Sequence, residues 1–464
     1  MFVSRLALDD FRSWQQMVID FVPGLNLLFG ANGLGKTNIV EALEVLSTGG
    51  SHRTSSSAPL VRAGARKATV RANVDDDGSV TTYEVSIPVR GANRARINSG
   101  KSLYMRDVVG RVPTVVFAPE DQRLIAAEPA ARRGFVNQSA SQLILGYYDV
   151  LQRFNQTGRQ RAALLKQIQQ QRVGSDARMG SDVSAASFPT SAGSSGLSSA
   201  DTPTDIGLPA YDPMAAALSG LEVWTGQFIE AGVELTRLRQ RFIDMLNGPF
   251  ARIYRELAGP RHHAELVYAP SFDEVTAYGD HDGHEDGEGG LLAYDPQSQR
   301  GDGDCSDLVT DSPDDQIRMA ISRHFQRIYP GEVAQARNLI GPHRDDVIVR
   351  LNGMNARDYA SNGEMWTLAL AMKMALFEVI KAERGDDPIL ILDDVFAQLD
   401  ESRRRQIVDF ASRQSQVLIT MAAESDMPQG LDAHRIDVAD IVAAQDAQED
   451  QYAQEVQESQ EAQA

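Results

Sequence analysis

The chain has 464 residues, of which 42% are hydrophobic and 23% are charged, so it is long enough for two or three globular domains. Its single cysteine, Cys305, excludes an intrachain disulfide and a multi-cysteine zinc site, and it favours a reducing environment. No apolar run reaches the ~18 residues of a membrane span. The N-terminus reaches Asp9 and Asp10 without the apolar core of a signal peptide. We therefore expect a cytoplasmic protein without membrane contact.

The net charge of −19 is concentrated in two segments. Residues 271–316 hold fourteen acids and one arginine, and residues 432–464 hold nine acids and one arginine. The rest of the chain is slightly basic, and residues 53–111 alone carry eleven Lys or Arg against five acids. A basic body is compatible with binding to a phosphate backbone. Acidic appendages can equally act as nucleic-acid mimics or as solubilisers, so charge alone leaves both interpretations open.

The first 120 residues are expected to form mainly strands. One strand begins at Val3, and a second covers residues 25–29 after Pro23-Gly24. Residues 38–46 have the apolar spacing of a helix. Over residues 68–120, short β-branched runs are broken by Gly-containing turns, which predicts hairpins.

The middle of the chain is expected to be helical. Residues 140–170 have an imperfect 3-4 apolar spacing, and residues 221–245 keep it without a break. This spacing predicts that the two helices form a short antiparallel, coiled-coil-like hairpin. An ordinary helical bundle would bury the same row of apolar residues. Residues 172–213 and 272–316 are predicted to be disordered insertions because they are rich in Ser and Gly or in acids.

The α/β character returns towards the C-terminus. Strands are expected over residues 347–351, 389–392 and 417–420, and a long apolar helix over 364–381. Residues 441–464 read as an acidic, Gln-rich tail of low complexity. The sequence thus predicts an α/β body that is interrupted by a helical excursion.

A phosphate-binding loop follows the strand at residues 25–29. Its GxxxxGK[ST] pattern is Gly30-Ala31-Asn32-Gly33-Leu34-Gly35-Lys36-Thr37, and Asn38 opens the next helix. Backbone N–H groups of such a turn and of a helix N-terminus bind the phosphates of a nucleotide. Lys36 adds a positive charge, and the Thr37 hydroxyl can hold Mg²⁺. The strand-loop-helix context indicates a site for ATP.

A second motif has the pattern of a Walker B strand. The buried run of residues 388–392 ends in Asp393 and Asp394. Asp393 is expected to bind Mg²⁺, and Asp394 to orient or deprotonate the attacking water as the catalytic acid-base group, together with Lys36. A strand followed by an Asp-capped turn would give the same letters, but the phosphate loop makes the Walker B interpretation the better one.

Two further segments resemble parts of ABC-type ATPases. Asp400 lies six residues after Asp394, where those ATPases place an aspartate that faces the other subunit. Ser361-Asn362-Gly363-Glu364 precedes the long helix and can offer a hydroxyl and free N–H groups to an anion. Taken alone, this tetrapeptide is equally consistent with a plain helix N-cap.

The order of these motifs resembles the RecF family, bacterial recombination ATPases of the SMC/ABC superfamily. The resemblance extends to stretches that are not general ATPase motifs, namely Leu8-Asp9-Asp10-Phe11-Arg12-Ser13, Gly50-Ser51-His52-Arg53-Thr54, Val116-Phe117-Ala118-Pro119-Glu120-Asp121, Arg132-Arg133-Gly134-Phe135 and Gly341-Pro342-His343-Arg344-Asp345-Asp346. It covers most of the chain outside the two insertions and the tail.

The resemblance implies an α/β fold, an ABC/SMC-type P-loop ATPase head with mixed sheets and helices, plus a helical lobe with the coiled-coil-like hairpin. The head would comprise residues 1–125 and 335–440, and the helical lobe residues 126–334. It also implies that Arg12 and Asn38 belong to the nucleotide site. ATP would be held between the phosphate loop of one subunit and Ser361, Asn362, Gly363 and Asp400 of another.

The resemblance further implies a function. The protein would be a weak ATPase in which ATP with Mg²⁺ closes a homodimer on duplex DNA. It would mark single-strand/double-strand junctions, help to load RecA through RecR and RecO, and associate with the nucleoid when bound to DNA. Arg53 and Arg344 are candidates for contacts with phosphate groups of ATP or DNA, or else for structural ion pairs.

The sequence departs from the family pattern at two points. Glu364 stands where relatives often have Gln, and its charge would repel a γ-phosphate unless it is turned away. The residues after Thr420 lack a switch histidine, so we assign no catalytic histidine.

Other classes of ATPase fit the sequence less well. A transporter subunit has its signature much nearer to the phosphate loop, and a chromosome-structuring SMC protein needs far longer arms. An ATPase-coupled nuclease of the overcoming-lysogenization type needs a further domain after the Walker B strand. The remaining alternative is an SMC-like, nucleotide-gated scaffold that acts mainly through protein partners.

Overall fold

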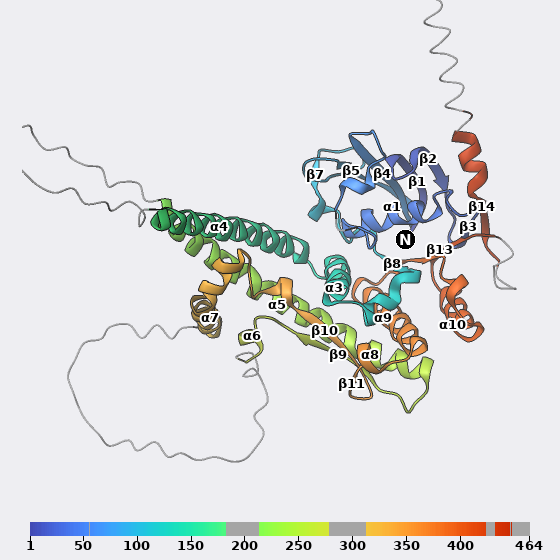
Figure 1. The fold of residues 1–464 in the computed structure, drawn as a ribbon. Coiled ribbons are helices and arrows are strands. Elements are labelled where there is room, and N and C mark those ends of the chain that lie inside the picture. Colours follow the sequence, from blue (N-terminus) through green and yellow to red (C-terminus); the bar gives the residue numbers. More distant parts are fainter. Residues whose placement is uncertain (55, 182–212, 278–311, 424–431, 446, 448–464) are drawn as a thin grey trace, which may run out of the picture. The chain divides into compact units, whose positions relative to one another are not determined.

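The computed structural model describes residues 1–54, 56–181, 213–277, 312–423, 432–445 and 447, which divide into two compact units (Figure 1). Unit 1 comprises Met1–Asp149, Leu238–Ala269 and Asp345–Ala464, and unit 2 comprises Val150–Arg237 and Pro270–Arg344. Most of the two predicted insertions and of the Gln-rich tail lies outside the described residues.

Unit 1 contains a six-stranded antiparallel sheet in the order β2-β1-β4-β5-β6-β7. Apolar residues of β1 and β4 point alternately into the core, as expected for a sheet with one buried face. The predicted hairpin between β4 and β5 turns at Asp77-Gly78, where both residues have positive φ. The strands are β1 (Phe2–Phe11), β2 (Trp14–Asp20), β4 (Lys67–Asp76), β5 (Ser79–Pro88), β6 (Arg94–Ile97) and β7 (Leu103–Tyr104).

A second, parallel sheet of unit 1 carries the predicted phosphate loop and Walker B motif. Its order is β14-β3-β13-β12-β8, and β12 is buried along its whole length. Helix α1 (Lys36–Thr48) is buried on most of its surface because it packs on strands of both sheets. The strands are β3 (Gly24–Phe29), β8 (Thr114–Phe117), β12 (Ile389–Asp393), β13 (Gln416–Met421) and β14 (His434–Asp437).

The remaining elements of unit 1 include a three-stranded antiparallel sheet of β9 (Ala264–Ala269), β10 (Asp346–Leu351) and β11 (Met354–Asn355). Helix α9 packs on β8, which confirms the long apolar helix expected there. The helices are α2 (Arg123–Ala126), α3 (Pro129–Leu143), α8 (Ala356–Tyr359), α9 (Asn362–Arg384) and α10 (Glu401–Ala411), with short 3-10 turns η1 (Ala58–Leu60), η2 (Met105–Asp107), η3 (Pro119–Gln122) and η6 (Phe396–Gln398).

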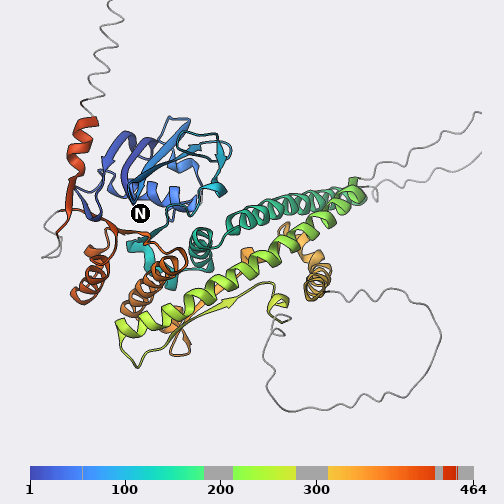
Figure 2. The same ribbon diagram turned by 180° about the vertical axis from the view of Figure 1, so that it is seen from behind.

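Helices α4 (Tyr147–Ser181) and α5 (Pro213–Ala258) pass through the boundary between the units. Within unit 2 they run antiparallel and side by side, as both views show (Figures 1 and 2). Arg153 of α4 donates a hydrogen bond to Glu234 of α5. Arg161, which lies later in α4, donates to Thr225, which lies earlier in α5. This confirms the predicted antiparallel pair. Unit 2 also contains α6 (Glu274–Ala277), α7 (Pro313–Gln335) and η5 (Pro342–Arg344).

The structure differs from the sequence-based expectations in the helical region. The helix expected over residues 140–170 is two helices, because the chain turns at Gly146, whose φ of 84° is disfavoured for other residues. Helix α4 also continues to Ser181, inside the predicted insertion 172–213, and α6 and the start of α7 lie inside 272–316. Within the described ranges, every helix is too short or too polar to span a bilayer.

Candidate nucleotide site

The phosphate loop connects β3 to α1 as its pattern predicted. Lys36 is the first residue of α1, and its ammonium group donates to the carbonyl oxygens of Gly30 at 2.5 Å and Ala31 at 3.0 Å. Burial lowers the pKa of Lys36, while Asp394 and Asp393 act in the opposite direction. The ammonium group thus lies across the loop, close to two carboxylates.

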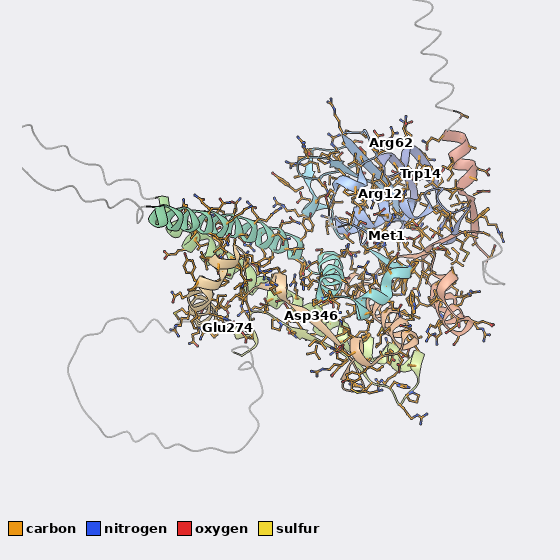
Figure 3. All side chains as sticks on the ribbon, viewed as in Figure 1. Met1, Arg12, Trp14, Arg62, Glu274 and Asp346 are labelled. Carbon is orange, nitrogen blue, oxygen red and sulfur yellow. The ribbon has the colours of Figure 1, made fainter. Side chains whose placement is uncertain are left out.

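Gly35 has a backbone conformation and surroundings that only glycine tolerates. Its φ is 91°, and an added Cβ would lie 2.9 Å from both Ser13 Oγ and Trp14 Nε1. The indole of Trp14 donates to the Gly35 carbonyl oxygen at 3.2 Å. Trp14 and Arg12 belong to the N-terminal part of unit 1, where Figure 3 labels both. The family-like segment around residues 8–14 therefore supports the phosphate loop.

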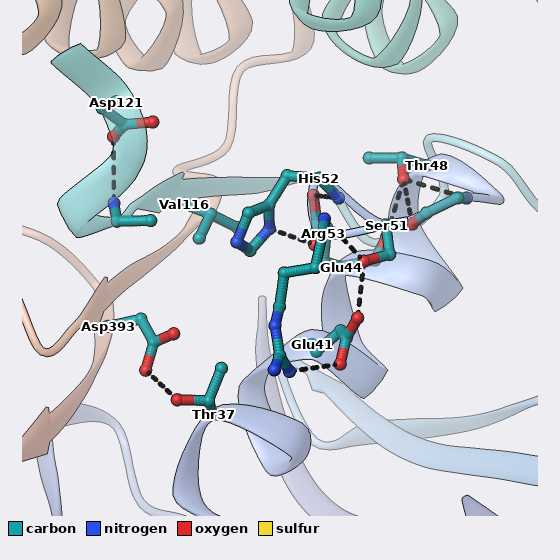
Figure 4. Close-up of polar contacts among 12 residues, drawn as sticks. Thr37, Glu41, Glu44, Thr48, Ser51, His52, Arg53, Val116, Asp121 and Asp393 are labelled. Atoms are coloured by element: carbon teal, nitrogen blue, oxygen red, sulfur yellow. Dashed lines mark hydrogen bonds and ion pairs between the residues drawn. The ribbon is translucent and has the colours of Figure 1, made fainter. Parts of the chain in front are cut away.

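Asp393 lies at the C-terminal end of β12 and is 4% exposed. Its Oδ1 accepts hydrogen bonds from Thr37 Oγ1 at 3.0 Å (Figure 4) and from Thr420 Oγ1 at 2.6 Å. Burial raises the pKa of Asp393, although the two hydroxyl groups oppose this effect. A buried carboxylate beside a threonine hydroxyl is a set of oxygen donors that suits Mg²⁺.

Asp394 directly follows β12 and has a φ of 50°, an uncommon conformation for a residue other than glycine. Its backbone N–H donates to Thr420 Oγ1 at 2.9 Å, which helps to hold this conformation. Backbone strain of this kind often occurs at functional positions. The turn brings the Asp394 carboxylate near enough to Lys36 to act on its pKa.

Glu41 holds two arginines beside the phosphate loop. Its side chain is fully buried and forms ion pairs with Arg12 at 2.5 Å and with Arg53 at 2.9 Å (Figure 4 shows the pair with Arg53). Burial opposes ionisation of Glu41, but its hydrogen bonds with Arg12 and Ser51 and the charges of both arginines bring its pKa below the usual value. Arg53 also donates to Asn38 Oδ1 at 3.0 Å. Three predicted site residues, Arg12, Asn38 and Arg53, are thus joined in one network.

His52 lies near the site and belongs to the family-like stretch of residues 50–54, although the sequence assigned it no role of its own. Its Nδ1 lies 2.7 Å from Glu44 Oε2, and its backbone N–H donates to Glu44 Oε1 at 3.0 Å (Figure 4). Burial lowers the pKa of His52, but Glu44, with a smaller contribution from Asp121, outweighs burial and raises the pKa above 6.5. The imidazole is close enough to Asp393 to act on the pKa of that carboxyl group.

The signature segment forms the N-terminus of α9. Ser361 is the N-cap, and its hydroxyl accepts from the Glu364 N–H while the Glu364 carboxylate accepts from the Ser361 N–H, which is a capping box. Glu364 is therefore turned back onto its own helix. Gln122 donates to the carbonyl oxygen of Asn362 at 3.3 Å, so η3 contacts this segment.

Asp400 caps helix α10 and pairs with Arg403. In the part of the chain that the structure describes, no hydrogen bond or ion pair joins residues 30–38 to residues 361–364 or to Asp400. The two predicted halves of the nucleotide site thus form separate hydrogen-bond networks within one chain.

The segment Gly341-Pro342-His343-Arg344-Asp345-Asp346 divides into exposed and buried parts. Arg344 is exposed. Asp345 is buried and pairs with Arg239, and Asp346 pairs with Arg132 (Figure 3 labels Asp346). The two aspartates therefore have structural partners, and Arg344 is the exposed side chain of the segment.

Sequence reasoning missed the contributions of Thr420, Glu41 and Gln122. Thr420 pairs with Asp393 through the parallel register of β12 and β13, which a single sequence does not reveal. Glu41 could have been suspected, because a charged residue on the buried side of an apolar helix needs a partner. Gln122 contacts a segment 240 positions away in the chain.

Known proteins resemble this chain along most of its length. Residues 2–440 match the family described as "RecF/RecN/SMC N terminal domain". The chain is 55% identical over 439 residues to "DNA replication and repair protein RecF" of Bifidobacterium adolescentis, covering 95% of this chain and 91% of the relative. It is 53% identical over 440 residues to the protein of that name in Bifidobacterium longum subsp. infantis, covering 95% and 89%.

A solved structure described as the "recombination mediator protein RecF-ATPrS in RecFOR pathway" has a TM-score of 0.69 with 23% identity, covering 94% of this chain and 96% of that one. This similarity shows the fold, an ABC/SMC-type P-loop ATPase fold, which confirms the fold class expected from the sequence.

Proposed function

Because the chain belongs to the RecF family of SMC/ABC-type P-loop ATPases, we propose that it is an ATP-dependent DNA-binding protein of DNA replication and recombinational repair. The named role of its relatives supports this class of function. The observation that carries the nucleotide-dependent part is the 3.0 Å hydrogen bond between Thr37 and Asp393, because it joins the phosphate loop to the Walker B strand.

The nucleotide would be held by residues Gly30 to Asn38, with Lys36 as the cationic contact to its phosphates. When bound, Mg²⁺ would supply positive charge at the phosphates, and Thr37 and Asp393 fit it because both offer oxygen atoms to one point. Asp394 would orient the attacking water. Glu41 holds both Arg12 and Arg53, so both remain candidate contacts with phosphate, and Arg53 is the more exposed of the two at 40%.

The signature and Asp400 would act on the nucleotide of a second copy. This is consistent with their separation from the phosphate loop within one chain. An ATP bound between two copies makes contacts that exist only in the closed dimer, and such contacts give ATP the differential affinity that a conformational switch needs. Weak hydrolysis would then open the homodimer.

Unit 1 carries a basic surface that suits a phosphate backbone. Two guanidinium groups contact the half-exposed ring of Tyr104, with Arg94 Cζ 4.4 Å and Arg106 Cζ 4.7 Å from its centroid. A neighbouring cavity of about 650 Å³ is lined by Arg106, Arg111 and Arg384, together with Asp107 and Asp149, which both pair with Arg106. Among the described residues, neither Arg111 nor Arg384 forms an ion pair with a carboxylate. Burial, and then the charge of Arg111, lower the pKa of Arg384, so an anion would relieve an unfavourable pair.

The more specific role in recombination is proposed from membership of the family. We place the protein at duplex DNA and at single-strand/double-strand junctions, where it would help to load RecA through RecR and RecO. This places it in the cytoplasm, associated with the nucleoid when it is bound to DNA. The alternative, a nucleotide-gated scaffold for protein partners, shares the ATP site but predicts no link between ATP and DNA.

The test is fluorescence anisotropy of labelled duplex DNA, with and without Mg-ATP, on the wild type, Asp394→Asn and Lys36→Ala. We expect ATP to tighten binding by the wild type, and more strongly by Asp394→Asn, which binds ATP without hydrolysing it. Lys36→Ala should show no ATP effect. If ATP leaves the DNA affinity of the wild type and of Asp394→Asn unchanged, the scaffold alternative is favoured instead.

A further inference from the structure

Arg403 of helix α10 contacts both segments that are proposed to reach a second copy. Its backbone N–H donates to Asp400 Oδ1 at 2.9 Å, and its Nη1 pairs with the other oxygen of the same carboxylate. Its Nη2 donates to the carbonyl oxygen of Gly363 at 2.8 Å. One side chain therefore connects the Asp400 loop to the signature turn, although these segments are separated in sequence by helix α9 and strand β12.

Three hydrogen bonds join Arg403, Thr367 and Gly363 in a ring at the signature. Arg403 Nε donates to Thr367 Oγ1 at 3.2 Å, and that hydroxyl donates to the Gly363 carbonyl oxygen at 3.0 Å. Arg403 Nη2 donates to the same carbonyl oxygen. The side chain of Arg403 is 25% exposed, so these bonds are partly shielded from water. Bonds to a charged donor contribute more than bonds between neutral groups.

The same arrangement explains the glycine of the signature. A Cβ added to Gly363 would lie 2.9 Å from Arg403 Nη2, closer than such atoms approach one another. Any larger residue would therefore displace the guanidinium group from the Gly363 carbonyl oxygen. A planar group with several fixed donors is suited to this position, whereas a lysine could reach only one of the acceptors at a time.

From these contacts we propose that Arg403 is a positioning residue that holds Asp400 and the turn at Ser361-Asn362-Gly363 as one rigid surface for the nucleotide of a second copy. This inference rests on the proposed ATP-dependent homodimer. Arg403 acts through Asp400 and Gly363, because Nε, Nη1 and Nη2 each already have a partner within the chain. Its loss should weaken the dimer without weakening ATP binding to the phosphate loop of the same chain.

The test compares Arg403→Ala with Arg405→Ala, a matched control on the same helix. Arg405 is 72% exposed, and among the described residues its ion pair is with Glu401 one turn earlier. Binding of a fluorescent ATP analogue to the monomer is measured by titration, and dimer formation with Mg-ATP by analytical ultracentrifugation. We expect Arg403→Ala to bind the analogue with the affinity of the wild type. Its dimer dissociation constant should rise by about tenfold or more, because charge-assisted hydrogen bonds that hold the dimer surface are lost. Arg405→Ala should match the wild type in both measurements.

A subunit-mixing experiment separates action in trans from a local defect. Arg403→Ala and Lys36→Ala are each expected to be deficient in ATP hydrolysis. A mixed dimer has one site with an intact phosphate loop and an intact opposing surface, so mixing the two variants should restore hydrolysis. If Arg403 served the nucleotide of its own chain, no mixture would recover, and the inference would be wrong.

Two further results have distinct meanings. If the wild type forms no dimer with ATP, the proposed function fails and this inference fails with it. If the wild type dimerises and Arg403→Ala dimerises equally well, only the inference fails. Should Arg403→Ala not fold, Arg403→Lys gives the same test, because it keeps the charge but can reach only one of the acceptors at a time. An Arg403→Lys variant with wild-type dimerisation would also overturn the inference.

Discussion

The hydroxyl of Thr420 donates a hydrogen bond to Asp393 Oδ1 over 2.6 Å, from the strand that neighbours the Walker B strand. The same oxygen of Thr420 accepts the backbone N–H of Asp394 at 2.9 Å. One side chain on β13 thus fixes the carboxylate proposed to bind Mg²⁺ and the backbone of the proposed catalytic residue. The parallel register, which places Thr420 opposite Asp393, makes both contacts possible.

Replacing Thr420 by valine should reduce ATP hydrolysis while leaving the fold intact. Valine keeps the shape but removes the hydroxyl, so Asp393 loses a donor that favours its charged form and Asp394 loses an acceptor for its N–H. We expect a decrease in turnover of about tenfold, the value of one hydrogen bond to a charged group. Thr420→Ser retains the hydroxyl and should keep most of the activity. Equal turnover in Thr420→Val and the wild type would show that this contact does not matter for hydrolysis.

Substitutions of Asp394 should separate charge from backbone conformation. Asparagine tolerates a φ of 50° nearly as well as aspartate, whereas alanine does not. Both Asp394→Asn and Asp394→Ala should lose hydrolysis, but only Asp394→Ala should lower the free energy of unfolding, by about 1 kcal/mol. Thermal unfolding of both variants measures the difference in stability, and turnover assays on the same two variants measure the loss of hydrolysis. Equal stability of the two variants would mean that the left-handed conformation carries no such cost.

Much of the site could be predicted because its parts are local in sequence. The phosphate loop is a contiguous pattern between a strand and a helix, and Asp393 and Asp394 directly follow an apolar run. Their meeting could also be expected, since the carboxyl ends of parallel strands share one edge of a sheet. Fold class followed from the same motifs, and the antiparallel pair of α4 and α5 from apolar spacing.

Other contacts could not be predicted because they depend on which segments become neighbours. The bond from Gln122 to Asn362 and the bonds from Arg403 to Gly363 join segments with no shared pattern. The break at Gly146 was missed because the apolar spacing continues on both sides of it, and spacing reports the buried face rather than the continuity of a helix.

The pair of His52 and Glu44 should make stability depend on pH. The pKa of His52 is raised in the folded state above its ordinary value of 6.5, so the pair stabilises the fold fully below that pH. This stabilisation is lost as the pH rises through the folded-state pKa. The difference in free energy of unfolding between the wild type and His52→Gln should therefore be larger at about pH 6 than at about pH 8.5.

Urea unfolding of the full chain, followed at several pH values, measures this difference. Glu44→Gln provides the control, because it removes the carboxylate that raises the pKa of His52 and should abolish most of the pH dependence. If the difference in free energy of unfolding between the wild type and His52→Gln grows as the pH rises, the pair with Glu44 does not stabilise the charged form of His52.

The pair of Asp345 and Arg239 should matter for folding rather than for nucleotide binding. Both side chains are almost fully buried, and Arg239 Nη1 donates to Asp345 Oδ2 at 2.8 Å, while the hydroxyl of Tyr268 also contacts that oxygen. Removing one member of a buried pair leaves the other charge uncompensated. Asp345→Ala should therefore lower the free energy of unfolding by ~3–5 kcal/mol.

The exposed pair of Arg5 and Asp20 is the natural comparison. Its side chains are 54% and 63% exposed, and water screens their attraction. Asp20→Ala should therefore change the free energy of unfolding far less than Asp345→Ala does. Chemical denaturation of both variants gives the comparison, and titration of the folded fraction of Asp345→Ala with an ATP analogue should yield the wild-type affinity. A weakened affinity in that fraction would instead connect Asp345 to the nucleotide site, and would extend the role of the segment 341–346 from folding to ligand binding.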